Sequence, residues 1–367
     1  MRKVVHIITD TNIGGAGHHM LALLGEMCKN GNYSPEVILP ENSRLVPLIA
    51  NLQIPFHEVP HIADMSYSKL GVKVLYKKLK EIAPDIVHTH ASFSGRIAAK
   101  KYRRCRIVHT LHCAFPVAKW RKMFPMRQLF GFMNNRYSHR MIAVSPVAEK
   151  TLLEMGAKKR KIQVIYNGVP PARQYSNEEA LALRDKYSIP HDSFVVAFIA
   201  RLTEIKGHDY VLDMARELPF NVIILCAGDG EYQAHLQARI KKEGLENNVR
   251  LLGFVENIPE ILAIMDVQIN MSYVSETTSL SLLSGMSVGK PAIVTRFGGN
   301  TYVIEDKVNG LLIPPQSPEA LDEAITRLKE DNDLYSRLAT GAKARYNEQF
   351  TAERLAAETE RLYSELV

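Results

Sequence analysis

The residues best suited to chemistry lie where Glu276 follows the apolar run 266–272 and precedes an apolar helix. Strand, loop, helix and strand in this order are typical of α/β proteins, which bind ligands beyond the carboxyl ends of their strands. We expect the backbone N–H groups of Thr278, Ser279 and Leu280 to open the helix, point outward and bind a diphosphate. Glu276 can accept hydrogen bonds from sugar hydroxyls, and the helix N-terminus would favour its ionised form. The stretch predicts a sugar-nucleotide site.

Two cations follow another apolar strand, 194–200. They are Arg201 and Lys206, in the segment RLTEIKG. At the carboxyl end of a strand, both can neutralise a diphosphate and stabilise it as a leaving group. The alternative is a solvated loop with ordinary charges.

A glycine-rich turn, NIGGAG at 12–17, follows the first apolar strand. Gly14 and Gly15 would allow positive φ angles and a close approach of the backbone to phosphate. A nicotinamide fingerprint needs three glycines with the spacing GxGxxG and an acidic residue at the end of the second strand. The third glycine of that spacing is absent and Glu41 is a poor match, so a dehydrogenase is not expected.

Histidines raise the question of a metal. His88 and His90 alternate on one strand face, and His112 follows the next strand, where it is either a packed residue or part of a site. Because a helical HxxxH pattern and an accompanying carboxylate are missing, we expect no metal. Asp331 and Asp333 have a DxD spacing, but between two helices an aspartate acts as a cap.

Strand and helix patterns alternate along the whole chain, which predicts parallel sheets covered on both faces. Expected strands are 3–9, 35–39, 85–90, 106–111, 141–145, 162–166, 194–200, 221–227, 249–253, 266–271, 291–295 and 310–314. Expected helices include 18–29, 65–82, 94–102, 119–137, 146–155, 318–331, 333–349 and 351–366.

A length of 367 residues suggests two domains. The break at 167–179, rich in Pro, Asn and Ser, is read as the linker. It separates a first domain, 1–168, from a second, 169–350, and we expect the last helix, 351–367, to pack back on the first. No apolar run reaches membrane-spanning length, no signal peptide follows Met1, and the four cysteines are scattered. A reduced, cytoplasmic protein fits these features.

The net charge of +7 is unevenly distributed. Residues 1–170 hold 26 Lys and Arg against 10 Asp and Glu, a balance of +16, whereas the rest hold 20 against 29, a balance of −9. This asymmetry suggests an anionic partner for the first half. The alternative is a basic surface without a partner.

The segment 115–140 concentrates this charge and contains no acidic residue. It interleaves aromatic residues with the cations Lys119, Arg121, Lys122, Arg127, Arg136 and Arg140. Such a stretch can lie on an anionic membrane or bind a lipid-phosphate acceptor. The alternative is a helix with its aromatics in the core, interrupted by Pro125.

Taken together, these motifs resemble the retaining glycosyltransferases of family 4. The resemblance extends over essentially the whole chain in order and spacing. It rests on the glycine turn, His112 and the segments 87–95, 143–150, 164–169, 200–207, 227–231 and 270–300, with GGN at 298–300. The resemblance implies the α/β GT-B fold, in which two Rossmann-like domains face across a cleft. The first would carry the acceptor side and the second the nucleotide-sugar donor.

The resemblance also implies roles for single residues. Gly15, with Gly14 beside it, would offer its amide to the donor phosphate. Arg201 and Lys206 would clamp the diphosphate. The backbone amides of Ser279 and Leu280 would contact the phosphate, and Glu276 would contact hydroxyls of the donor sugar. Val255 would lie near the nucleobase and His112 beneath the reacting sugar.

There is one departure from the family pattern. The second glutamate of the E-x7-E motif, the usual ribose ligand, falls at Ser284. Serine is shorter, uncharged and offers one hydroxyl contact. We expect an active variant with weaker ribose recognition, in which Ser281 or ordered water substitutes for the missing contact.

The expected function is that of a metal-independent, retaining hexosyltransferase without a cofactor. It would move a sugar from a nucleotide-diphosphate sugar, here a UDP-sugar, to a hydroxyl acceptor that is anionic or lipid-linked. Cell-envelope, polysaccharide or glycolipid synthesis on the cytoplasmic side of a membrane would suit it, and nucleic acid is not an expected partner. The alternatives are a sugar-nucleotide-binding pseudoenzyme and a non-hydrolysing sugar-nucleotide epimerase.

Overall fold

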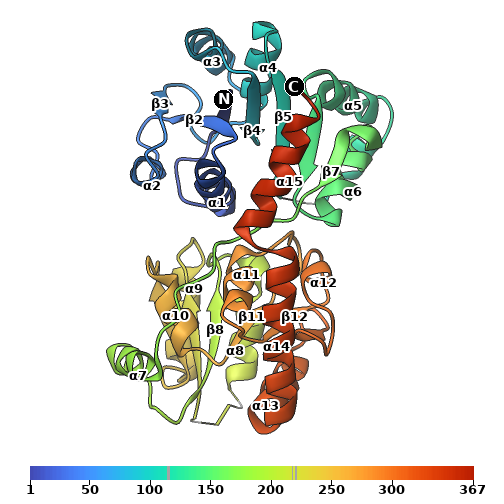
Figure 1. Cartoon of the computed structure of the whole chain (residues 1–367). Helices are drawn as coiled ribbons and strands as arrows, with labels where there is room; N and C mark the ends of the chain where they lie inside the picture. Colours follow the sequence, from blue (N-terminus) through green and yellow to red (C-terminus); the bar gives the residue numbers. More distant parts are fainter. Residues whose placement is uncertain (114–115, 217, 220) are drawn as a thin grey trace. The chain divides into compact units, whose positions relative to one another are not determined.

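The computed structural model describes residues 1–367 except 114, 115, 217 and 220. The chain divides into two compact units (Figure 1). Unit 1 comprises Met1–Val169 together with Thr351–Val367, and unit 2 comprises Pro170–Phe350. The last helix therefore belongs to the same unit as the first strand.

Unit 1 is built on a seven-stranded sheet in the order β3-β2-β1-β4-β5-β6-β7, with parallel pairing throughout. Its strands are β1 (Arg2–Ile8), β2 (Tyr33–Pro40), β3 (Phe56–Val59), β4 (Ile86–His90), β5 (Arg106–Leu111), β6 (Arg140–Ala143) and β7 (Ile162–Val164). The order reverses between β1 and β4, and such a switch point opens a crevice at the carboxyl ends of the strands.

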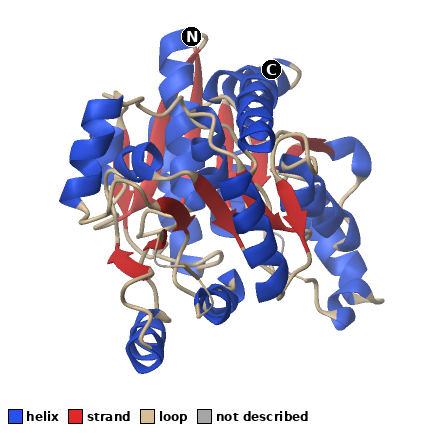
Figure 2. Ribbon diagram, turned by 90° about the horizontal axis from the view of Figure 1, so that it is seen from below, coloured by secondary structure: helices blue, strands red, loops and turns tan. Residues whose placement is uncertain are grey.

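Helices lie around the strands of the protein (Figure 2), and in unit 1 they cover both faces of the sheet. They are α1 (Gly15–Asn30), α2 (Val46–Asn51), α3 (Lys69–Ile82), α4 (Phe93–Tyr102), α5 (Met126–Arg136), α6 (Pro146–Glu154) and α15 (Ala352–Ser364), with short 3-10 turns η1 (Lys119–Lys122) and η2 (Lys159–Lys161). Leu75 and Leu79 of α3 pack on one face, while Leu23 of α1 and Leu355 of α15 pack on the other. Burial on both faces explains why the strands read as continuous apolar runs.

Unit 2 has a six-stranded parallel sheet in the order β10-β9-β8-β11-β12-β13. Its strands are β8 (Phe194–Ile199), β9 (Val222–Ala227), β10 (Val249–Gly253), β11 (Val267–Asn270), β12 (Ala292–Thr295) and β13 (Leu311–Ile313). This order is the Rossmann order, with the switch point between β8 and β11.

The helices of unit 2 begin at local capping signals. Ser176 and Glu179 form a capping box, and the side chains of Ser279 and Ser317 accept from backbone N–H groups of the helices that follow them. The helices are α7 (Asn177–Lys186), α8 (His208–Ala215), α9 (Gln233–Glu243), α10 (Ile258–Ile264), α11 (Leu280–Ser287), α12 (Asn300–Val303), α13 (Pro318–Glu330) and α14 (Asn332–Gln349), with the 3-10 turn η3 (Glu204–Lys206).

The sequence reading of elements missed the short strand β3 and also differed from the structure at one helix and at the linker. The single helix expected over 119–137 is instead η1 followed by α5, which begins directly after Pro125. The expected linker, 167–179, contains the start of α7. Because α7 has no buried residue, its sequence lacks the apolar periodicity that marks a packed helix.

Candidate functional site

The two segments singled out in the second half of the sequence meet at the switch point of unit 2. Arg201 and Lys206 follow β8, and Glu276 follows β11. Because β8 and β11 pair in parallel, their carboxyl ends lie at the same edge of the sheet. Residues distant in sequence therefore share one site.

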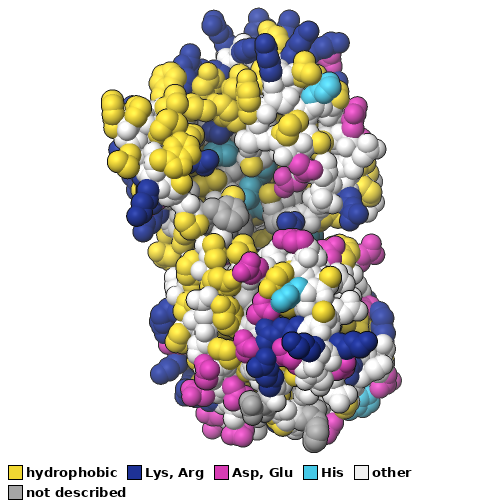
Figure 3. Space-filling view, turned by 180° about the vertical axis from the view of Figure 1, so that it is seen from behind, with side chains coloured by type: hydrophobic (Ala, Val, Ile, Leu, Met, Phe, Trp, Pro, Cys, Tyr) yellow, Lys and Arg dark blue, Asp and Glu magenta, His cyan; other side chains and the backbone are white. Residues whose placement is uncertain are grey.

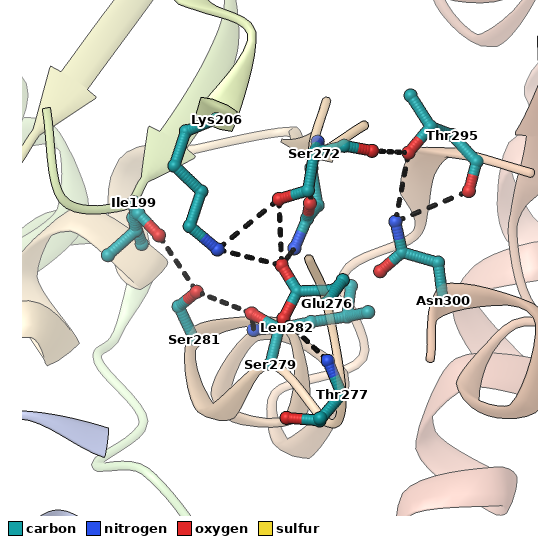
Figure 4. A network of polar contacts seen from close by, with 11 residues as sticks. Ile199, Lys206, Ser272, Glu276, Thr277, Ser279, Ser281, Leu282, Thr295 and Asn300 are labelled. Atoms are coloured by element: carbon teal, nitrogen blue, oxygen red, sulfur yellow. Dashed lines mark hydrogen bonds and ion pairs between the residues drawn. The ribbon is translucent and has the colours of Figure 1, made fainter. Parts of the chain in front are cut away.

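Glu276 is the centre of this site (Figure 4). Its Oε2 accepts hydrogen bonds from Lys206 Nζ at 2.9 Å, Asn270 Nδ2 at 3.0 Å and Ser272 Oγ at 2.8 Å. Only 7% of the residue is exposed. Three donors thus converge on one carboxylate oxygen and fix the side chain.

The surroundings of Glu276 favour its ionised form. Burial alone would raise the pKa of the carboxyl group. The charge of Lys206 and the hydrogen bonds from Lys206, Asn270 and Ser272 outweigh burial and hold the pKa below its ordinary value. The expected stabilisation by a helix N-terminus needs correction, since α11 begins four residues later, at Leu280. The ion pair with Lys206 takes that role.

The loop that carries Lys206 is held by a close backbone contact. Gly207 ends η3 with a φ angle of 82°, and a Cβ there would lie 2.5 Å from the carbonyl oxygen of Met271. A side chain at this position would therefore push the Lys206 loop away from β11. Arg201 lies at the same edge but is exposed, and it forms no ion pair with any described residue. No ion pair with a described residue of unit 2 therefore neutralises its charge.

The start of α11 matches the prediction in part. Ser279 is the N-cap, and its Oγ accepts from the Leu282 N–H at 3.4 Å. Leu280 is the first helical residue, so its N–H is one of the groups that a helix leaves unpaired. Thr278 precedes the cap and is buried, and the outward direction of its backbone N–H stays a prediction.

Two serines of α11 differ in the hydrogen bonds that they form. Ser281 Oγ donates to the carbonyl oxygen of Ile199 at 2.8 Å and ties α11 to the end of β8 (Figure 4). Ser284, which stands where the family has its second glutamate, donates to the carbonyl oxygen of Leu280 at 3.0 Å. In this arrangement the Ser284 hydroxyl bonds within its own helix.

The GGN turn supports the Glu276 loop, a role that the sequence did not reveal. The Gly299 N–H donates to the carbonyl oxygen of Glu276 at 3.0 Å. A Cβ at Gly299 would lie 1.2 Å from the carbonyl oxygen of Thr277, so any side chain would displace the loop. Asn300 Nδ2 donates to Thr295 Oγ1 at 3.1 Å, and Thr295 Oγ1 donates to the carbonyl oxygen of Ser272 at 2.6 Å.

Val255, the expected neighbour of a nucleobase, follows β10 and lines a hollow of about 530 Å³. Its other lining residues are Lys186, Tyr187, Leu252, Phe254, Glu256, Asn257 and Glu260. The hollow combines apolar and polar side chains, which suits a planar polar ring.

In unit 1, the glycine turn differs from the prediction. Gly14 has an extended backbone with φ −116° and caps α1, and Gly15 is the first residue of that helix. The expected positive φ angles are therefore absent at both positions. A Cβ on either glycine would meet nothing within 4 Å, so the backbone is accessible without an unusual conformation.

His112 belongs to a group of histidines in unit 1. Its Nε2 lies 2.9 Å from Nδ1 of His90, and burial followed by the charge of His19 lowers its pKa well below the ordinary value. Two sets of three rings have nitrogens within 4.8 Å of one another, close enough to hold a metal ion. They are His6, His88 and His90, and His19, His90 and His112. The sequence indicated the alternation of His88 and His90 and the place of His112 after the next strand, but not which rings contact one another.

The other candidate metal motif is structural. Asp331 caps α14, accepting from the Leu334 N–H at 2.8 Å. The interpretation of this aspartate as a cap is confirmed.

The basic segment of unit 1 presents hydrophobic side chains to solvent (Figure 3). We call the exposed residues Trp120, Arg121, Met123, Phe124, Arg127, Leu129 and Phe132 the basic aromatic patch. Phe124 is 81% exposed, so the alternative that these aromatics fill the core is wrong for this part of the segment. Phe115, which opens the segment, lies outside the described residues.

The cations of this segment are not equivalent. Arg121 lies 5.0 Å from the centroid of the Trp120 ring. Lys122 forms an ion pair with Glu154 at 2.7 Å. Its charge is therefore partly neutralised, which the sequence did not predict. Every helix in the described part of the chain is too short or too polar to cross a membrane.

Comparisons with known proteins bear on the family and the fold of the chain. Residues 13–173 match the family model described as Glycosyltransferase Family 4, and residues 180–345 match that described as Glycosyl transferases group 1. The UDP-Gal:alpha-D-GlcNAc-diphosphoundecaprenol alpha-1,3-galactosyltransferase of Escherichia coli is 29% identical over 71% of this chain and 70% of its own length.

Two further relatives span the full length. The N-acetyl-alpha-D-glucosaminyl L-malate synthase of Bacillus anthracis is 24% identical over 100% of this chain and 98% of its own. The crystal structure of Anabaena Alr3699/HepE in complex with UDP and glucose superposes with a TM-score of 0.86 at 23% identity, covering 99% of this chain and 100% of that one. This likeness shows the fold.

Proposed function

Because the chain belongs to the family 4 glycosyltransferases and has the GT-B fold, we propose that it is a retaining hexosyltransferase that uses a UDP-sugar and needs no metal ion. The observation that carries this proposal is the ionised Glu276 held by Lys206 at the switch point of unit 2. The complexes of HepE with UDP and with UDP-glucose support the choice of donor.

Each residue of the site has a part in this reaction. Lys206 and Arg201 would bind the diphosphate and stabilise the charge that grows as its bond to the sugar breaks. The free backbone N–H of Leu280 would add a hydrogen bond to a phosphate oxygen. With two cations and a helix N-terminus, the chain can supply the positive charge that a metal ion provides elsewhere.

Glu276 would orient the donor sugar. Its Oε2 is occupied by three donors, whereas the contact of Oε1 is with the neighbouring Thr277 N–H at 3.2 Å. Oε1 therefore retains capacity to accept from a sugar hydroxyl. In the proposed front-face reaction, the leaving phosphate oxygen takes the proton of the acceptor hydroxyl. The new bond to the sugar carbon forms on the face where the old bond breaks.

We further propose that unit 1 receives the acceptor at a cytoplasmic membrane surface. The basic aromatic patch combines exposed aromatic rings with Arg121 and Arg127, a composition that suits anionic lipid headgroups. The Escherichia coli relative is named for a diphosphoundecaprenol-linked acceptor, which supports a lipid-linked acceptor here. Cell-envelope polysaccharide or glycolipid synthesis is the corresponding role.

Incubation of the purified protein with a panel of nucleotide-diphosphate sugars tests the assignment. A retaining transferase would slowly release free sugar of unchanged anomeric configuration, preferentially from one UDP-sugar and equally with EDTA present. Appearance of an epimerised sugar nucleotide would instead identify the epimerase alternative. Binding without turnover, in the presence of lipid-linked and soluble acceptors, would identify a pseudoenzyme.

A further inference from the structure

A row of hydrogen-bonded histidines crosses the sheet of unit 1 at its own switch point. His6 lies on β1, His90 ends β4 and His112 follows β5. These three strands are neighbours, and His6 pairs in register with His88, which shares a sheet face with His90. The rings of His88 and His90 stack with centroids 4.6 Å apart, and His88 is held by Tyr363 and Thr110. We call His6, His90 and His112 the histidine row.

Two contacts connect the row. His6 Nδ1 lies 3.1 Å from His90 Nε2, and His90 Nδ1 lies 2.9 Å from His112 Nε2. Each contact between two ring nitrogens needs one proton, so one ring donates and the other accepts. Burial lowers the pKa of all three imidazoles, so each ring is neutral near pH 7 and carries a single N–H.

The free end of the row decides the direction of donation. His6 Nε2 is fully buried and has no partner among the described residues. If the row ran from His112 to His6, this atom would be a buried N–H without an acceptor, which is the more costly type of unpaired group. If donation runs from His6 to His112, His6 Nε2 carries no proton and presents only a lone pair. The second direction is therefore favoured.

A neighbouring histidine independently shows the same pattern. His19 Nδ1 lies 2.8 Å from the Asn167 carbonyl-type oxygen Oδ1, so Nδ1 carries the proton. Its Nε2 is also buried without a partner among the described residues. The interior of this unit thus accommodates a bare histidine Nε2 beside the row.

We propose that His6 and His90 are positioning residues that hold His112 as the neutral Nδ1–H tautomer. Nε2 of His112 accepts from His90, so its Nδ1–H is the group that can donate to an oxygen of the donor sugar. This step rests on the proposed function together with the place beneath the reacting sugar that the family resemblance implies for His112. In such an arrangement His112 serves as a hydrogen-bond donor, and the departing diphosphate, not the imidazole, takes the proton of the acceptor.

The tautomers can be measured directly in the whole protein without any substrate. In protein labelled with 15N-histidine, long-range proton–nitrogen correlation spectra distinguish a protonated from a bare ring nitrogen. The signals of each ring are assigned by their loss in His6→Asn, His90→Gln and His112→Gln. We expect protonated Nδ1 and bare Nε2 in all three rings. A protonated Nε2 at His112 would overturn the inference, as would stoichiometric zinc bound to these rings in the purified protein.

Kinetics of matched variants test the consequence. His6→Leu removes the first donor and should release His112 into a mixture of tautomers, lowering kcat about tenfold with little change in donor KM. His6→Asn places an amide N–H near the position of Nδ1 and should restore kcat and the tautomer of His112. His109→Leu, which removes another buried histidine from the same sheet outside the row, should leave both unchanged.

The outcomes separate this inference from the proposed function. A merely structural role would lower the thermal stability of His6→Leu and His109→Leu alike while the His112 tautomer stayed fixed, and would overturn the inference. An inactive wild-type protein would refute the proposed function, whereas the spectra of His112 would still decide the tautomer assignment.

Discussion

Lys206 and Glu276, 70 residues apart in sequence, form an ion pair of 2.9 Å between Nζ and Oε2 at the carboxyl edge of one sheet. Glu276 is 7% exposed and Lys206 is the more accessible partner, with 24% of its side chain exposed. The pair joins the residue assigned to the diphosphate with the residue assigned to the sugar, so each can be tested through the other.

Replacing Lys206 by alanine should slow transfer by a factor on the order of 10² or more at saturating donor, because a stabiliser of the leaving group is lost. It should also lower the melting temperature, since the buried carboxylate of Glu276 loses its counter-ion. Arg201→Ala is the matched control. It should slow transfer without changing the melting temperature, because Arg201 is exposed and has no ion-pair partner among the described residues. Near-normal turnover of Lys206→Ala would contradict the proposed role of Lys206 in binding the diphosphate.

Glu276→Gln should reduce the rate of transfer while leaving the affinity for UDP largely intact. The amide keeps the shape of the side chain but loses the charge that orients the sugar hydroxyls and pairs with Lys206. Calorimetric titration with UDP and steady-state kinetics with the complete donor separate the two effects. Mass spectrometry of the wild-type protein with donor should detect no glycosyl ester, and an ester trapped on Glu276 would favour a two-step route.

Ser284→Glu should tighten UDP binding, since it restores a carboxylate where the family places its ribose ligand. Ser284→Ala should bind UDP like the wild type, because the native hydroxyl bonds to the carbonyl oxygen of Leu280 within its own helix. Titration calorimetry of both folded variants tests the pair. An unchanged affinity in Ser284→Glu would mean that other groups contact the ribose.

The basic aromatic patch should bind vesicles that contain phosphatidylglycerol at low salt and release them at high salt. Each cation near an anionic bilayer contributes on the order of 1 kcal/mol. The double change Arg121→Gln with Arg127→Gln should weaken co-sedimentation strongly. Lys122→Gln should weaken it less, because Lys122 is paired with Glu154.

Neutralising Lys241 and Lys242, exposed cations of α9 in unit 2, provides the control for net charge and should have little effect. If the wild-type protein stays in solution at low salt, and the variants of Arg121, Lys122 and Arg127 transfer normally, the acceptor is soluble.

The buried histidines should make the protein sensitive to mild acid. Burial lowers the pKa of His6 to about 3 and that of His19 to about 4, from 6.5. As the pH falls below 6.5, these histidines bind protons in the unfolded chain but stay neutral in the folded protein. The stability from their neutral burial is therefore present above pH 6.5 and is lost toward pH 4 and below.

When the pH is lowered from 6.5 to roughly 5.5, each such histidine should reduce the free energy of unfolding by about 1 kcal/mol. Urea unfolding of the wild type and of His6→Leu at both pH values measures the effect, and the variant should lose about one histidine's share of the dependence. An equal pH dependence of the unfolding free energy in both proteins would show that folding does not lower the pKa of His6.

Elements with strong local patterns could be predicted from the sequence. The bounds 106–111 match β5, because an apolar run buried on both faces leaves an unambiguous signal. The bounds 249–253 also match β10, although most of that strand is only partly buried. The short strand β3 and the polar helix α7 carry no such signal and were missed. The helix expected over 119–137 was interrupted next to Pro125, which favours a break but does not fix its position.

The sequence by itself determined the order of the elements, the family, and which side chains could do the chemistry, among them Glu276, Lys206 and His112. These properties follow from residue type and from periodicity over a few turns or strands. Only the tertiary structure decided how these side chains are partnered. The pairing of Lys206 with Glu276, the support from Gly299 and the histidine row depend on strand order and loop geometry, which bring together backbone segments far apart in the chain. Such contacts leave no local pattern in the sequence, because their partners are far apart in the chain. The entropy cost of closing the loop between two such residues rises only slowly with the length of the loop, so sequence distance does not indicate which residues meet.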